Sequence, residues 1–114
     1  IFAEGFASRE FLHGPIQLLN EKTPVLFMLS ADEIDGFLEL METIRKFGAP
    51  LIAISEKSDR AGEIFDGLAC IPEGFPKTFS PILYVVPLQL FAYYSSIARN
   101  LNPDKPEKLR KVVK

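Results

Sequence analysis

Two unbroken apolar runs, separated by a stretch with helical periodicity, constrain the fold of this chain more than any other feature. Residues 24–30 (PVLFMLS) and residues 50–55 (PLIAIS) show no alternation of apolar and polar side chains. Uninterrupted runs of this length are typical of strands in a parallel sheet with both faces covered. We therefore expect two strands that are each buried on both faces.

The segment between the two runs has the pattern of an amphipathic helix. Ser30 and Glu33 have the spacing of a capping box, and Gly48 stands where a helix would end. Between them, apolar side chains recur at helical spacing, namely Ile34, Phe37, Leu38, Met41 and Ile44. Residues 24–55 are therefore expected to form a strand–helix–strand unit with a right-handed crossover.

Shorter elements are expected on both sides of this unit. A short strand is expected in residues 2–8, and Pro15 suits the first turn of a short helix. Further along, residues 60–65 favour a short helix and residues 68–71 a third strand. The predicted fold class is α/β, with a parallel sheet flanked by helices in a single domain of 114 residues.

A long apolar helix is expected over residues 81–99. Ser80 is expected to cap it, Pro81 suits its first turn, and Pro87 should bend it. The segment is close to the ~20 residues that span a membrane, but it contains Gln89 and an internal proline. We favour burial between layers of the protein or in an oligomer interface, and therefore predict a dimer and no membrane contact.

The composition excludes several kinds of site. The net charge of −2 does not show the excess of positive charge that is typical of nucleic-acid-binding domains. The chain has one cysteine, Cys70, and one histidine, His13, which excludes an internal disulfide and any cluster of Cys or His metal ligands. We expect no metal or cofactor. Cys70 is expected to be a buried thiol. A signal-peptide pattern is not visible, so we expect a cytoplasmic protein.

Few residues point to chemistry by themselves. His13 precedes a Gly-Pro turn, where an imidazole would be exposed and able to transfer protons near neutral pH, although a structural histidine is the commoner case. Glu10 could orient it or could be a surface residue. Lys111 lies among apolar residues of a basic tail, where desolvation would make its amine nucleophilic, but a surface lysine fits the pattern as well.

Three stretches, taken in order along the chain, resemble the sugar isomerase (SIS) domain family. They are residues 3–15 (AEGFASREFLHGP), residues 79–94 with the run PLQLFAYY, and residues 104–112 (DKPEKLRKV). The resemblance is to the latter part of the second SIS domain of the glucosamine-6-phosphate synthase family. It implies a three-layer α/β/α domain over residues 1–114 that lacks its first strand and helix, with residues 102–114 as a tail that closes on the active site.

The same resemblance implies a function and a set of site residues. The family isomerises phosphosugars, and its synthases make glucosamine-6-phosphate from fructose-6-phosphate with amino transfer. His13 would assist sugar ring opening in the site of a neighbouring subunit, and Lys111 would form a Schiff base with the open-chain ketose. Glu10 and Arg110 would support substrate binding.

Further domains and two other functions stay open at this point. The resemblance implies a homodimer with a shared active site, together with an upstream glutaminase domain and a first SIS domain. The FLHGP form of the histidine motif is similar to that of shorter relatives, which include SIS-type glucosamine-6-phosphate deaminases. A noncatalytic SIS module that binds sugar phosphates and regulates a partner is the third alternative.

Overall fold

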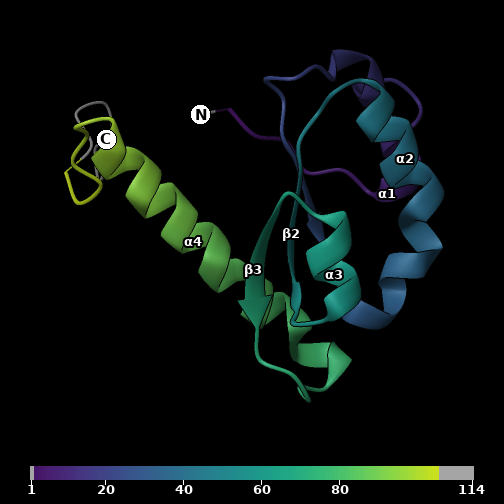
Figure 1. The fold of residues 1–114 in the computed structure, drawn as a ribbon. Helices are drawn as coiled ribbons and strands as arrows, with labels where there is room; N and C mark the ends of the chain where they lie inside the picture. Colours follow the sequence, from purple (N-terminus) through teal and green to yellow (C-terminus); the bar gives the residue numbers. More distant parts are fainter. Residues whose placement is uncertain (1, 106–114) are drawn as a thin grey trace. The chain divides into compact units, whose positions relative to one another are not determined.

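The structure is a computed structural model in which residues 2–105 are described (Figure 1). These residues divide into two units at the junction of Glu73 and Gly74. The first unit contains the sheet and the second contains the long helix. The tail residues Arg110 and Lys111 lie outside the described residues.

The first unit is built on a three-stranded parallel sheet. Its strands are β1 (Val25–Met28), β2 (Leu51–Glu56) and β3 (Gly67–Ile71), in the spatial order β1-β2-β3. Both neighbouring pairs are parallel. The predicted α/β fold is therefore confirmed, because parallel neighbours require crossover connections and both connections here contain helices.

The helices between the strands form where the sequence places them. The 3-10 helix η2 (Ala31–Phe37) continues directly into α2 (Leu38–Lys46), and α3 (Asp59–Ile64) connects β2 to β3. The capping box of Ser30 and Glu33 is present. Gly48 follows the helix with a φ of +76°, a left-handed conformation that L side chains rarely adopt.

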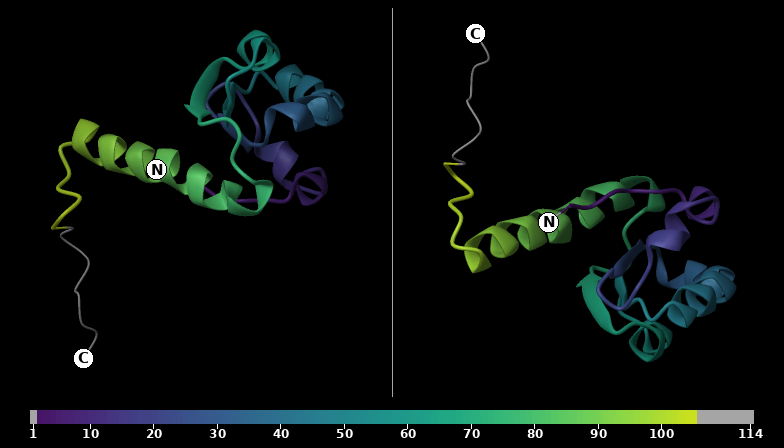
Figure 2. Two further views of the ribbon diagram at one scale, coloured as in Figure 1. Left: turned by 90° about the horizontal axis from the view of Figure 1, so that it is seen from below. Right: turned by 90° about the horizontal axis from the view of Figure 1, so that it is seen from above.

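The core lies between the sheet and these helices. Both crossovers advance the chain in the same direction across the sheet, and right-handed connections of this kind place their helices on the same face. The two figures agree with this arrangement, since α2 and α3 lie on one side of the strands (Figures 1 and 2). The helical and strand side chains that meet there are buried, among them Ile34, Met41, Ile44, Leu51 and Ala53.

Burial of β1 on both faces, as predicted, is wrong. Phe27 packs into the core, with its ring centroid 5.9 Å from that of Phe65. Its neighbours Leu26 and Met28 face the opposite way and are 41% and 51% exposed. The reason is that β1 is an edge strand and the crossover helices of this unit cover only one face of the sheet.

The thiol of Cys70 is exposed rather than buried, which corrects a second expectation. Cys70 lies in β3, at the other edge of the sheet. In an edge strand, side chains can remain exposed to solvent even where the sequence is apolar. The central strand β2, by contrast, has four of its six residues buried. Position in the sheet therefore decides burial more than the apolar pattern does.

The N-terminal segment forms short helices. Residues 2–7 have no regular structure, and α1 (Ser8–Phe11) follows them, so the strand expected in residues 2–8 is wrong. The short helix predicted at Pro15 is confirmed as the 3-10 helix η1 (Pro15–Leu18). A strand needs a neighbour to accept its backbone hydrogen bonds, and the described sheet contains only β1, β2 and β3.

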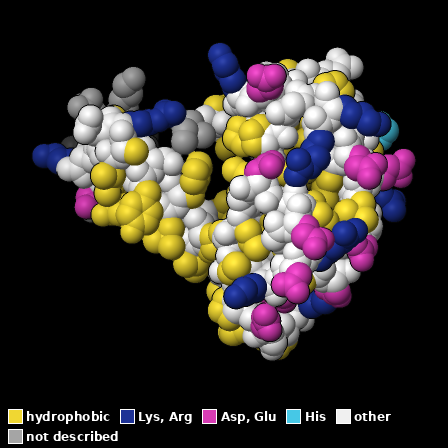
Figure 3. Space-filling model, viewed as in Figure 1, with side chains coloured by type: hydrophobic (Ala, Val, Ile, Leu, Met, Phe, Trp, Pro, Cys, Tyr) yellow, Lys and Arg dark blue, Asp and Glu magenta, His cyan; other side chains and the backbone are white. Residues whose placement is uncertain are grey.

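The second unit contains η3 (Lys77–Phe79) and α4 (Ser80–Ala98), which confirms the predicted long helix. Ser80 is not its cap, because Phe79 occupies that position and the Ser80 hydroxyl donates to the Lys77 carbonyl at 2.8 Å. None of the α4 side chains is buried, and apolar atoms cover much of its visible surface (Figure 3). By length and composition alone, the segment Lys77–Ala98 is sufficient to cross a membrane.

Candidate active site

The predicted acid–base residue His13 lies in the short connection between α1 and η1. Its backbone N–H donates to the Glu10 carbonyl at 3.1 Å, which closes the last turn of α1. On the other side, the Gln17 N–H donates to the Gly14 carbonyl at 3.0 Å. The backbone on both sides of His13 is therefore hydrogen-bonded, while its imidazole is exposed.

Two apolar side chains anchor this connection to the first unit. Phe11 and Ile16, which flank His13, pack against the buried core cluster. Phe11 also contacts Phe6, with their ring centroids 6.1 Å apart. The structure therefore presents an exposed imidazole on a backbone that is fixed from both sides.

Glu10 and His13 share this turn, but only their backbones are bonded to each other. Among the described residues, no side-chain hydrogen bond or ion pair joins the Glu10 carboxylate to the imidazole. Both side chains are exposed. The structure thus brings two of the four predicted site residues together, while Arg110 and Lys111 lie beyond the part of the chain that it describes.

A second group of polar residues gathers at the carboxyl ends of β1 and β2, the edge of an open α/β sheet where ligands commonly bind. The Ser30 N–H donates to the Glu33 carboxylate at 2.8 Å, and the Ala31 N–H donates to the Glu56 carboxylate at 2.8 Å. The Ser55 hydroxyl is fully buried without a hydrogen-bond partner in the described structure. Ser58 caps α3 by accepting from the Ala61 N–H at 3.0 Å.

The bond of Glu56 to Ala31 is the feature of this edge that our sequence reasoning missed. The two residues are 25 positions apart, and only the register of β1 and β2 brings them together. The sequence pattern predicts this bond only weakly, because Glu56 is simply the first charged residue after an apolar run. Over residues 2–105, no three His, Cys, Asp or Glu side chains form a group that could hold a metal ion.

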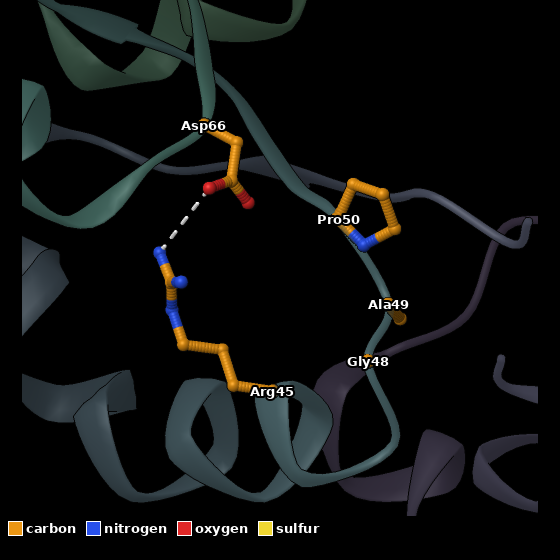
Figure 4. A pocket seen from close by; sticks show the side chains of 5 residues that line it. All are labelled: Arg45, Gly48, Ala49, Pro50 and Asp66. Atoms are coloured by element: carbon orange, nitrogen blue, oxygen red, sulfur yellow. Dashed lines mark ion pairs between the residues drawn. The ribbon is translucent and has the colours of Figure 1, made fainter. Parts of the chain in front are cut away.

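A shallow pocket lies at the opposite, amino edge of the sheet (Figure 4). Its lining includes Arg45 and Asp66, whose side chains are 3.7 Å apart at their closest charged atoms. The Arg45 guanidinium also donates to the Ile64 carbonyl, and the Asp66 carboxylate accepts from the Leu51 N–H at 2.8 Å. These contacts join α2 to the starts of β2 and β3, and none of the predicted catalytic residues lines the pocket.

The fold defines the class of this chain as an α/β domain with a parallel sheet, and comparison with known proteins extends that description. The chain is 37% identical over 114 residues to the glutamine–fructose-6-phosphate aminotransferase (isomerizing) of Thermococcus kodakarensis, covering 99% of this chain and 19% of that protein. The enzymes of the same name from Methanothermobacter thermautotrophicus and Clostridium perfringens are each also 37% identical, over 116 and 117 residues. These matches again cover 99% of this chain, and 20% and 19% of the two relatives. No family model matches the chain.

Over nearly its whole length, the chain therefore resembles part of an isomerising aminotransferase, which confirms the resemblance predicted from the sequence. The chain spans about a fifth of the length of the curated relatives that it matches. The relatives' names refer to glutamine, fructose-6-phosphate and isomerisation.

Proposed function

We propose that residues 1–114 are part of the second SIS domain of a phosphosugar isomerase that makes glucosamine-6-phosphate from fructose-6-phosphate with amino transfer. The observation that carries this proposal is the similarity of 99% of the chain to part of an enzyme named for that reaction. The exposed His13 turn, anchored to the core on both sides, supports it, because ring opening requires an acid–base group that the sugar can reach.

The proposed chemistry divides between His13 and Lys111. His13 moves the proton that opens the sugar ring and exposes the carbonyl group. The amine of Lys111 then attacks that carbonyl and loses water, which forms a Schiff base to the open-chain ketose. Glu10 and Arg110 assist in binding the substrate, and the tail of residues 102–114 closes on the site.

The same proposal includes partners and a compartment. Because the relatives are about five times as long as this chain, a glutaminase domain and a first SIS domain would complete the enzyme. Two copies would share their active sites, with the apolar helix α4 contributing to the contacts between domains or subunits. The enzyme would work in the cytoplasm, where phosphosugars are made and used.

Trapping the Schiff base tests this proposal. The natural polypeptide that contains this segment is incubated with fructose-6-phosphate, reduced with borohydride and digested for mass spectrometry. We expect a reduced sugar phosphate on Lys111 that is absent from Lys111→Ala and retained in the matched control Lys46→Arg. A different modified lysine, or none in an active preparation, would overturn the role of Lys111.

Ring opening tests His13 separately. We expect His13→Asn to lower kcat for fructose-6-phosphate by about a hundredfold or more, the usual contribution of a general acid–base group. Binding of an open-chain analogue, which has no ring to open, should be unchanged. Equal losses for both ligands would mean that His13 has a structural role.

Two other functions predict different results from the same preparation. A deaminase would release ammonia from glucosamine-6-phosphate and would not use glutamine as nitrogen donor. Because the match covers only 19% of the relative, a noncatalytic module that binds sugar phosphates is the second alternative. Such a module would bind phosphosugars without turnover and would show no trapped lysine.

A further inference from the structure

The turn that holds His13 lies between two helices that are too short to fix its position by themselves. On the N-terminal side α1 has four residues, none of them buried, and on the C-terminal side η1 also has four residues and none that is buried. Helices of this length are unstable in isolation, because the first turn fixes several residues for very few hydrogen bonds. The position of the His13 backbone must therefore be set by side chains that reach beyond the turn.

Phe11 makes such a contact on the N-terminal side. Its N–H donates to the Ala7 carbonyl at 3.1 Å, and the neighbouring Glu10 carbonyl accepts from the His13 N–H at 3.1 Å. The Phe11 side chain is partly buried and packs against the core cluster of the first unit. The ring of Phe6 lies beside it, with an interplanar angle of 53°. Phe11 thus connects the backbone of the His13 turn to the core.

The neighbours of Phe11 do not share this contact. Glu10, Leu12 and His13 are exposed, and none of them belongs to the packed core. Ile16 makes a similar contact from the C-terminal side of the turn. Aromatic side chains have the largest contact areas in protein cores, so Phe11 is expected to contribute more than Ile16 to holding the turn.

We propose that Phe11 is a positioning residue for His13, which holds the imidazole where it opens the sugar ring and does not itself touch the substrate. This inference rests on the proposed function, because it concerns the step that His13 performs there. Packing restrains an exposed side chain such as His13 only weakly, so the place of the imidazole depends on the backbone that Phe11 fixes. A displacement of ~1 Å in a catalytic group can lower a rate by about a hundredfold.

A double-mutant cycle in the natural polypeptide that contains this segment tests the proposal. We expect Phe11→Ala to lower kcat for fructose-6-phosphate by about tenfold or more and to change KM by less than about twofold. In the His13→Asn background, which has no imidazole to position, the same substitution should change kcat by less than about twofold. Equal losses of kcat in the two backgrounds would overturn the proposal, because Phe11 would then act independently of His13.

Two further variants separate positioning from a loss of stability. Phe37→Ala removes the same atoms from another partly buried ring that packs against this core, but Phe37 belongs to η2. It should leave kcat within about twofold of the wild type. Phe11→Leu keeps an apolar side chain at the anchor and should restore kcat to within about threefold of the wild type. A loss of kcat in Phe37→Ala as large as that in Phe11→Ala would also overturn the proposal.

Hydrogen exchange measures the anchoring without any turnover. The N–H groups of His13 and Gln17 are hydrogen-bonded within the turn, so their exchange reports how firmly it is held. In Phe11→Ala we expect peptides from residues 8–19 to exchange about tenfold faster or more, while peptides from β2 exchange as in the wild type. Unchanged exchange in residues 8–19 would overturn the anchoring by Phe11.

The same pair of measurements distinguishes this proposal from the proposed function. If the wild type does not turn over fructose-6-phosphate, the proposed function fails, and the exchange rates still decide whether Phe11 anchors the turn. If the wild type is active and Phe11→Ala exchanges faster without losing kcat, the positioning role fails and the proposed function stands. If Phe11→Ala does not fold, Phe11→Val replaces it in both measurements, because it removes the ring and keeps part of the apolar contact.

Discussion

The two units of this chain have similarly apolar sequences but opposite surroundings. In the first unit the apolar residues of η2, α2 and β2 meet in one core, and Ile34, Ile44 and Leu51 have no exposed surface. In the second unit α4 is apolar over most of its length, yet none of its side chains is buried. The comparison shows that an apolar sequence pattern indicates which side chains favour burial. The atoms that bury them can belong to the same unit, to a different part of the protein or to a partner.

A matched pair of isoleucines should show the largest contrast between the units. We expect Ile44→Ala to lower the free energy of unfolding by about 3 kcal/mol, because it leaves a cavity in a closed core. Ile82→Ala removes the same atoms from a side chain that is 63% exposed, and should cost less than about 0.5 kcal/mol. Urea unfolding monitored by circular dichroism measures both, and equal losses would show that α4 is covered in solution.

The next largest effect is expected at the amino edge of the sheet. Asp66→Asn weakens the pairing with Arg45 and the hydrogen bond from the Leu51 N–H, so it should destabilise the first unit by about 1–2 kcal/mol. Glu42→Ala, which removes an exposed carboxylate from α2, is the control and should have little effect. An unchanged unfolding midpoint for Asp66→Asn would mean that these contacts do not hold the strands.

Two glycines of the first unit should respond in opposite directions. Gly48→Ala places a Cβ in a left-handed conformation, 2.9 Å from the Cγ of Glu21, and should destabilise by about 1 kcal/mol or more. Gly62→Ala, within α3, meets no atom within 4 Å and should stabilise by about 0.5–1 kcal/mol. Thermal unfolding of both variants checks the signs, and the same sign for both would contradict the geometry of the helix end at Gly48.

The smallest effect on unfolding, with the largest effect on assembly, is expected in α4. Phe91→Glu changes a side chain that is 59% exposed and should alter the stability of the first unit by less than about 0.5 kcal/mol. If α4 contributes to a dimer, light scattering should show a shift from dimer to monomer. Phe2→Glu, at a position that is 87% exposed, is the control and should leave the assembly unchanged.

Much of the fold could be predicted because its signals are local. The capping box at Ser30, the helix end at Gly48 and the proline start of η1 each depend on residues within one turn of each other. The three strands followed from short apolar runs. The strand expected in residues 2–8 failed for the opposite reason, since a strand exists only where a neighbouring strand pairs with it.

In the candidate site, too, local features could be predicted from the sequence and tertiary contacts could not. The turn that holds His13 was predicted from the neighbouring Gly14 and Pro15, and its exposure is confirmed. The anchoring of that turn by Phe11 and Ile16 required the packed core. The contact between Glu56 and Ala31 had no local signal at all, because it depends on two strands that meet across 25 residues of chain.

By itself, the sequence determined the order and type of the main elements and the resemblance to an isomerising aminotransferase, which depends on motifs read along the chain. Only the tertiary structure decided which faces are covered. It left Leu26, Met28 and Cys70 exposed on edge strands, and it placed the carboxylate of Glu56 on the start of η2. The physical reason is that periodicity depends on neighbours in sequence, whereas burial and cross-strand hydrogen bonds depend on neighbours in space.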